Sequence, residues 1–394
     1  MARQRNVVSS RNSSIELLRL ATMLMIVSFH YVDFFHGLES QRFTFKKISF
    51  ELIYACGWIG NFIFFAISIW FLLDRDNTVR SSLRRVWILE RELLFWSITL
   101  LVAMLMFKLR GGYVGQVSMV NLAFHSAFPL STALWWYPTS YALFLIFLPF
   151  LNAGMKQLAQ RQHKQLAIIC LVLWGFLGLI PKINFDLTDK SVFVFIYWYI
   201  LLSYYRWHMK KISTRQCWIM LGIGAMTGAV WLLGTNLLFS LTGRMPQMQS
   251  FIFRHWRLPM MMMGFAIFLL VMRTEFHNRL INTLASSAFG IFLIHSYPPI
   301  LLSWVHYNPL DKIYQGEFAF LHAMAVVLYV YVACLLLDLI RQALFRLTID
   351  RRRGACFDRL YAWSVHRFGK RGEHLISVTG PSAGSKGDDS DLVD

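Results

Sequence analysis

The stretch IELLRLATMLMIVSFH, residues Ile15–His30, is an apolar run that carries three ionisable side chains, Glu16, Arg19 and His30. It lies within an apolar segment over residues 14–35, and about 20 such residues are enough for a helix to cross ~30 Å of hydrocarbon. A basic stretch precedes it, as in a secretory signal peptide, but no clear small-residue cleavage site follows. We therefore expect a retained first membrane helix. Because ionisable groups at membrane depth are costly and usually functional, these three residues are the first site candidates.

Helical geometry places Arg19 and His30 on one side of this segment. Eleven steps of about 100° complete three turns plus about 20°, and the rise is ~16.5 Å, so the two residues share a face at different depths. Glu16, three residues before Arg19, is positioned to pair with it, and Asp33, three residues after His30, is positioned to orient the imidazole. The alternative is that Glu16 and Arg19 extend to the lipid headgroups while His30 makes an ordinary interhelical hydrogen bond.

The composition of all 394 residues indicates a membrane protein, with 56% hydrophobic and only 15% charged residues. A soluble domain carries about 25% charged residues, so a soluble enzyme and a disordered chain are both excluded. The pattern predicts an all-α polytopic membrane protein with about ten transmembrane helices. The ten apolar segments cover residues 14–35, 57–73, 87–107, 134–153, 166–181, 191–207, 216–241, 258–273, 284–305 and 317–341.

The net charge of +18 is explained by topology rather than by nucleic-acid binding. With the N-terminus in the cytoplasm, the inner segments hold 26 lysines and arginines and the outer loops hold 11, which predicts both termini in the cytoplasm. The inner charges are expected to contact anionic lipid headgroups, and no nucleic-acid partner is expected. We expect a cytoplasmic segment 1–13, a transmembrane core 14–341 and a basic tail 342–394 that begins as an interfacial helix and ends in a disordered acidic stretch. The five cysteines have no metal-site spacing, so no metal is expected.

Five further polar or aromatic residues are candidates, each with a simpler alternative. His295 lies about eleven residues into the ninth apolar segment. It either contacts the substrate or is a histidine that only packs between helices. Trp135 and Trp136 open the fourth segment, either as a sugar-stacking wall or as part of an aromatic belt at the membrane interface. Arg84 and Arg85 precede the third segment, either to bind a phosphorylated cytoplasmic ligand or as topology-determining charge.

The same segments resemble a family of membrane-bound enzymes, acyltransferase type 3. Its first helix is marked by an Arg, ten residues and a His, often with an acidic residue three before the Arg, as in Ile15–His30. Four other stretches are similar and occur in the right order: GWIGNFIFFAISIWFL (57–72), WWYPTSYALFLIFLPFLN (135–152), LASSAFGIFLIH (284–295) and LLLDLIRQALF (335–345). The chain departs from the family where Ile69 follows Ser68 instead of Gly, and where Arg84 and Arg85 are adjacent instead of spaced by two.

The resemblance implies an O-acyltransferase of the cell membrane. It implies an acyl-CoA donor, most simply acetyl-CoA from the cytoplasm, and as acceptor a hydroxyl of a cell-surface polysaccharide or its lipid-linked precursor. Members from exopolysaccharide and capsule clusters look most similar, which implies glycan-assembly enzymes as possible partners. His30 would be the base or a transient acyl carrier. Arg19, with Arg84 and Arg85, would hold the donor.

Two other classes of protein are compatible with the buried Arg and His. A transporter or flippase for a lipid-linked glycan also places ionisable groups along its substrate path, although no inverted repeat is visible. A non-catalytic scaffold of a glycan-assembly complex is the third possibility, and it predicts that alanine at His30 has no effect.

Overall fold

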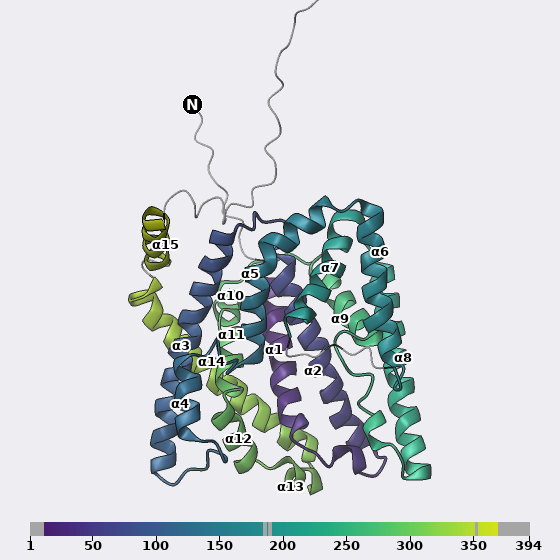
Figure 1. The fold of residues 1–394 in the computed structure, drawn as a ribbon. Coiled ribbons are helices and arrows are strands. Elements are labelled where there is room, and N and C mark those ends of the chain that lie inside the picture. Colours follow the sequence, from purple (N-terminus) through teal and green to yellow (C-terminus); the bar gives the residue numbers. More distant parts are fainter. Residues whose placement is uncertain (1–11, 184–186, 188–190, 351–353, 369–394) are drawn as a thin grey trace, which may run out of the picture.

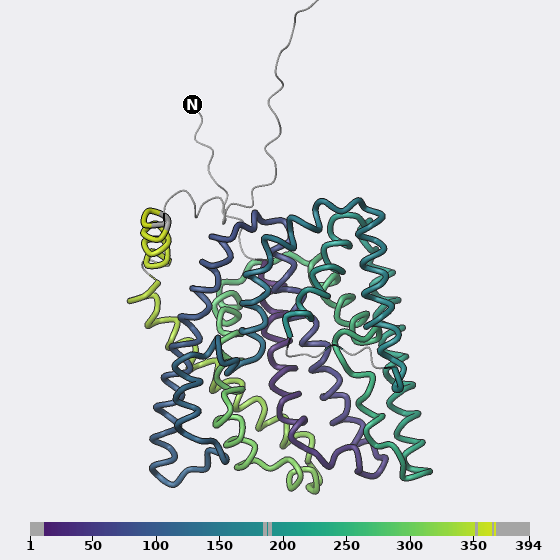
Figure 2. Tube along the Cα trace, viewed as in Figure 1, coloured from purple at the N-terminus to yellow at the C-terminus, as the bar shows by residue number. Residues whose placement is uncertain are grey.

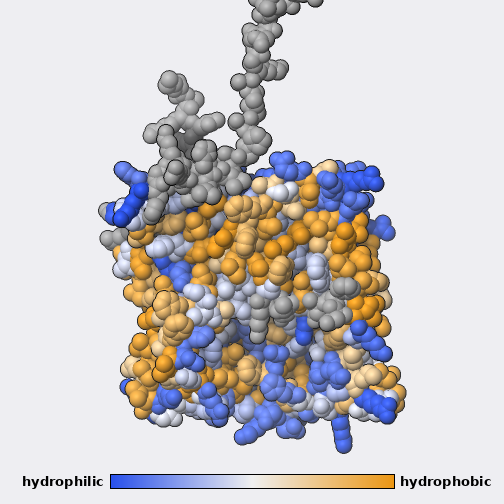
Figure 3. All heavy atoms as spheres, in the orientation of Figure 1, coloured by the Kyte–Doolittle hydropathy of each residue, from blue (hydrophilic) through white to orange (hydrophobic). Residues whose placement is uncertain are grey.

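Helices make up every regular element of the computed structural model, which describes residues 12–183, 187, 191–350 and 354–368 (Figure 1). Within these residues, seven helices are long and apolar enough to cross a membrane, or eight when one bent pair counts as a single span. Hydrophobic residues dominate the side of the molecule in Figure 3, and hydrophilic residues gather at both ends. The chain is therefore an all-α membrane protein.

Each of the ten predicted segments corresponds to helical structure. The seven candidate spans are α1 (Ser13–Asp33), α2 (Phe45–Trp70), α3 (Val79–Leu109), α5 (Trp136–Gln157), α6 with its continuation η2 and η3 (Gln160–Leu179), α8 (Thr214–Thr242) and α14 (Ala319–Leu347). Two predicted spans are shorter helices, α7 (Val192–His208) and α9 (Leu258–Val271). Shorter elements between or after these helices are η1 (Leu38–Ser40), α4 (Met119–Ala127), η4 (Pro246–Met248) and α15 (Ala355–Phe368). The expected disordered acidic end lies outside the described residues.

The ninth predicted segment, 284–305, is not one continuous helix. It is divided among α10 (Arg279–Ala285), α11 (Ala288–His295), α12 (Pro298–Tyr307) and α13 (Leu310–Gln315), with a bend of 79° after His295. Pro298 and Pro299 cause the break, because proline lacks the N–H that would continue the helical ladder but is well suited to the first turn of the next helix. His295 is therefore the last residue of a helix inside the bundle rather than a residue in the middle of a span.

The position of α1 in the bundle is central (Figures 1 and 2). It packs against α2, α9, α10, α11 and α14. A Cβ at Gly57 of α2 would lie 2.1 Å from Cβ of Phe29, so only glycine allows this close approach of the two helices. We call the end of the bundle where α1 begins the N-terminal face, and the end where α1 passes to η1 and α2 the far face. The side chains of α1 thereby reach the interior along its whole length.

Two segments predicted as outer loops are partly internal. Helix α2 begins at Phe45, twelve residues before the predicted start, because Thr44 caps it and Lys47 and Glu51 are buried within it. The segment 249–257 enters the bundle from the far face, and His255 and Arg257 there are 0% and 4% exposed. Non-helical backbone at membrane depth is tolerated where protein surrounds it. This segment directly precedes α9, which is shorter than the candidate spans.

Candidate active site

Two histidines from distant parts of the chain meet at the centre of the bundle. Nδ1 of His30, on α1, lies 2.8 Å from Nε2 of His295, at the end of α11. On its other side, Nδ1 of His295 lies 2.6 Å from the carbonyl oxygen of Ile291. His295 is completely buried, whereas His30 is partly accessible. Because α11 ends at His295, the imidazole of His295 is positioned to form a hydrogen bond with the imidazole of His30.

The carbonyl oxygen of Ile291 determines which nitrogen donates in each of these two hydrogen bonds. A carbonyl oxygen only accepts, so Nδ1 of His295 carries a proton and donates a hydrogen bond to the carbonyl oxygen of Ile291. In the neutral ring, Nε2 of His295 must then accept, and Nδ1–H of His30 is the donor. This assignment leaves the lone pair of His30 on Nε2. A neutral imidazole held in one tautomer with a free Nε2 is the arrangement that a general base requires.

A cavity of about 580 Å³ opens at the N-terminal face, within the range of ligand sites. Arg19 of α1, Arg341 and Arg346 of α14 line it together with Gln342. Two carboxylates, Glu92 and Asp350, also line it, and Glu92 pairs with Arg341. The more exposed guanidinium groups, of Arg19 and Arg346, suit a ligand with phosphate or carbonyl oxygens. Among its other lining residues are Ser68 and Tyr137, whose hydroxyl oxygens are 2.8 Å apart.

The inner end of this cavity is close to His30. Phe292 contacts both His30 and Tyr137, with ring centroids 6.5 Å and 5.9 Å apart. A second cavity, of about 250 Å³, lies at the far face and is lined by Val32 and Asp33 of α1. Along α1, Arg19 therefore lines one cavity, Val32 and Asp33 line the other, and His30 lies between them.

Carboxylates hold the guanidinium groups in place. Arg19 makes a 3.1 Å ion pair with Glu16. Arg341 donates through Nε to Oδ1 of Asp338 at 2.7 Å and pairs with Glu92 of α3 at 3.1 Å. Trp96 and Gln342 also donate to Asp338, at 3.2 Å and 3.0 Å. These contacts fix Arg341 rigidly at the cavity wall, while Arg19 retains 25% side-chain exposure.

The structure brings together some of the sequence candidates and not others. Glu16 and Arg19 meet as expected from their spacing, and His295 lies against His30. Asp33 is exposed one turn beyond His30 and lines the far cavity. Trp135 is 3% exposed and donates through Nε1 to the carbonyl of Leu293, so it packs inside the bundle. Trp136 is half-buried beside Phe65 and Tyr137.

The two arginines expected to bind the donor lie elsewhere. Arg84 is 3.5 Å from Asp358 of α15, and Arg85 donates to Oδ1 of Asn77 at 2.8 Å. Neither is among the described residues that line the cavity with Arg19. Arg341 and its partner Asp338 were not among the predicted site residues, although their i, i+3 spacing repeats that of Glu16 and Arg19.

A family model described as an acyltransferase domain matches residues 12–339, most of the chain. No curated protein and no solved structure gives a significant match. The matched range contains Arg19, His30 and His295, and ends two residues before Arg341. The chain belongs to the acyltransferase type 3 family and is a membrane acyltransferase.

Proposed function

We propose that this acyltransferase moves an acyl group, in the simplest case acetyl, from acyl-CoA to a hydroxyl of a cell-surface polysaccharide or its lipid-linked precursor. The observation that carries the proposal is the position of His30, held by His295 between two cavities. In the plasma membrane, the N-terminal face would be cytoplasmic and the far face external, in line with the charge bias of the loops. Donor and acceptor would then approach His30 from opposite sides.

The larger cavity supports an anionic donor. Arg19 and Arg346 present guanidinium groups at its wall, and Arg346 is exposed in the last turn of α14. Phosphate groups of CoA would bind these cations, and the part of the cavity lined by Ser68 and Tyr137 would take the thioester arm. The carbonyl oxygen of the thioester gains negative charge during transfer. Ser68 donates to the carbonyl oxygen of Phe64 and accepts from Tyr137, so Tyr137 is the hydroxyl that would turn from Ser68 to donate to the thioester.

The chemistry assigned to His30 is proton transfer. Nε2 removes the proton from the acceptor hydroxyl as its oxygen attacks the thioester carbonyl carbon. The carbon–sulfur bond then breaks, and the proton on Nε2 passes to the leaving CoA sulfur, so that the products are the ester and free CoA. While His30 is an imidazolium, Nε2 of His295 accepts its Nδ1–H and stabilises the charge.

The same geometry permits His30 to carry the acyl group itself. In that route Nε2 attacks the thioester, CoA leaves, and the acceptor hydroxyl then takes the acyl group from the imidazole. Quenched reactions with labelled acyl-CoA and no acceptor distinguish the two routes, because only the second leaves label on the protein.

The test of the proposed function is acylation of the cell-surface glycan by variants that still insert into the membrane. We expect His30→Ala and Arg19→Ala to remove ester-linked acyl groups while polymer export continues normally. Wild-type acylation in either variant contradicts the role given to that residue. Loss of export with normal acylation of the remaining polymer would indicate a transporter instead.

A further inference from the structure

The cavity at the far face, of about 250 Å³, is lined by several polar side chains. Three carboxylates, Asp33, Glu39 and Glu51, line it together with the amide of Gln249. They come from the end of α1, from η1, from α2 and from the segment that follows η4. Four separate parts of the chain thus contribute hydrogen-bonding groups to one small space.

The amide of Gln249 is buried and makes no hydrogen bond to the part of the chain that the structure describes. The residue is 1% exposed, and among the described residues neither Nε2 nor Oε1 has a hydrogen-bond partner. A buried amide without partners destabilises a fold, so such groups are rare and require an explanation. Because an amide offers both donors and an acceptor, it matches a hydroxyl, which also donates and accepts.

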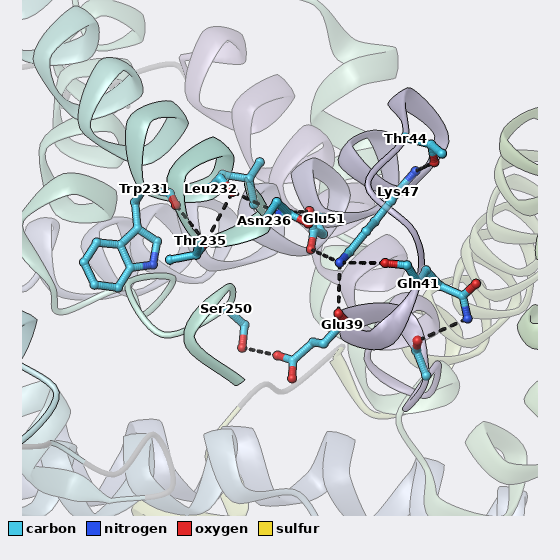
Figure 4. Close-up of polar contacts among 11 residues, drawn as sticks. Glu39, Gln41, Thr44, Lys47, Glu51, Trp231, Leu232, Thr235, Asn236 and Ser250 are labelled. Carbon is cyan, nitrogen blue, oxygen red and sulfur yellow. Dashed lines mark hydrogen bonds and ion pairs between the residues drawn. The ribbon is translucent and has the colours of Figure 1, made fainter. Parts of the chain in front are cut away.

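Two of the three carboxylates, those of Glu39 and Glu51, are held in position by neighbouring side chains (Figure 4). Glu39 accepts a 2.6 Å hydrogen bond from Ser250, and one oxygen of Glu51 accepts from Asn236 of α8 at 2.9 Å. The other oxygen, Oε1, is 3.8 Å from Nζ of Lys47 and accepts no hydrogen bond among the described residues. It is therefore available as an acceptor, and hydroxyl groups are its natural donors.

Lys47 stabilises this arrangement from behind the cavity. It is fully buried, and its Nζ donates to the carbonyl oxygens of Glu39 at 2.9 Å and Gln41 at 3.2 Å (Figure 4). The ammonium group of Lys47 therefore binds the loop after α1 and pairs with Glu51. Lys47 does not line the cavity. In the described part of the chain, the titratable groups that line the cavity are three carboxylates, the imidazole of His36 and the hydroxyl of Tyr54. Arg254, which does not line the cavity, donates to that hydroxyl at 3.3 Å.

We propose that the far cavity is a subsite for an uncharged sugar ring of the acceptor, bound through its hydroxyls by Gln249, Glu39 and Glu51, and that it discriminates against acidic sugars. The inference rests on the proposed function and adds the chemical class of the acceptor. A carboxylate on the ring would face like charges, and one such pair at contact distance changes affinity by about tenfold. An uncharged sugar ring instead donates hydrogen bonds from its hydroxyls to these carboxylates, and such charge-assisted bonds are strong.

The position of the subsite fits transfer at His30. Tyr54, which lines the cavity, contacts the ring of Phe29 at 5.0 Å, and Phe29 in turn contacts His30. On α1, the cavity begins two residues beyond His30, at Val32. A glycan bound here would place the neighbouring sugar unit, or a second hydroxyl of the same ring, toward the imidazole of His30.

The experiment measures sugar binding to the full chain in lipid nanodiscs, free of sugar-based detergents. The probes are methyl glycosides of glucose, galactose, mannose and N-acetylglucosamine, and the methyl glucuronide and galacturonide, followed by saturation-transfer NMR. We expect at least one neutral glycoside to bind at least tenfold more tightly than either uronide. Glu39→Gln should shift this ratio severalfold toward the uronides.

The Gln249→Met variant separates a binding role from a structural one. Removing an unsatisfied buried amide should leave the melting temperature unchanged or higher, while binding of the neutral glycoside falls at least tenfold. Gln41→Met is the matched control, because Gln41 lies in the same region, donates to the carbonyl of Gly37 and does not line the cavity. It should bind the glycoside as the wild type does.

Three results would overturn the inference: equal binding of uronides, absence of binding by all four neutral glycosides, or unchanged binding in Gln249→Met. Acyl-CoA binding and glycan acylation are measured on the same preparation. Acylation without neutral-sugar binding refutes the subsite alone. Neutral-sugar binding without any acyl transfer supports the subsite and refutes the proposed function.

Discussion

Removing the imidazole of His295 should reduce the rate of acyl transfer without unfolding the protein. In His295→Ala, Nδ1–H of His30 loses its acceptor at 2.8 Å, and the ring is free to rotate or to place its proton on Nε2. The lost bond is made to a ring that becomes charged during transfer, and such bonds contribute about 1.5–3 kcal/mol. This corresponds to a fall in kcat of about 10- to 150-fold. The KM for acyl-CoA should stay within about twofold, because the donor cavity is lined by other residues.

The assay follows transfer of labelled acetyl from acetyl-CoA to the envelope glycan in isolated membranes. His295→Gln should recover part of the rate, since an amide oxygen can replace Nε2 as the acceptor. His163→Ala is the control for loss of a buried imidazole, because His163 of α6 is equally buried and contacts the carbonyl of Ile200. A kcat within twofold of wild type in His295→Ala, or equal rates in the Ala and Gln variants, would refute the tautomer argument.

Three other perturbations test the donor cavity and the packing around it. Arg19→Lys keeps the charge but loses the planar fork, so the KM for acetyl-CoA should rise about tenfold in the membrane assay. Gly290→Ala places a Cβ 1.9 Å from Oδ1 of Asp338, and should lower stability by about 1–3 kcal/mol in thermal unfolding, whereas Gly154→Ala, with open space, should not. Lys47→Met leaves Glu51 buried without its ion pair and should cost about 3–5 kcal/mol, which Lys47→Met with Glu51→Gln should partly restore.

Local features of the fold could be predicted because they depend on local physics. The first apolar segment, expected over 14–35, is α1 from Ser13 to Asp33, and the i, i+3 spacing of Glu16 and Arg19 produces the ion pair between them. Hydropathy located all ten helical regions, since a spanning helix requires a continuous apolar stretch wherever it packs. Membrane acyltransferase membership followed from the order of motifs along the chain.

Features that depend on tertiary packing could not be predicted in this way. Lys47 and Glu51 lie outside the apolar window of the second segment, although they bury their charges against each other and Glu51 also accepts from Asn236, which is distant in the sequence. The hydrogen bond between His30 and His295 joins residues 265 positions apart, and no periodicity within either segment indicates it. The polar residues after η4 read as a loop, because hydropathy does not distinguish a solvated segment from one that other helices surround.

The two acid–arginine pairs at the N-terminal face are better explained by a ligand than by stability. Burying an ion pair costs desolvation energy that the attraction between the charges often fails to recover, so apolar residues would stabilise the same positions as well or better. Here the pattern occurs twice, as Glu16 with Arg19 on α1 and as Asp338 with Arg341 on α14, and both arginines line one cavity. The helices come from opposite ends of the chain, so a local folding requirement does not account for the coincidence. An anionic ligand that must enter the bundle does account for it, because each carboxylate then keeps its guanidinium in position until the ligand binds.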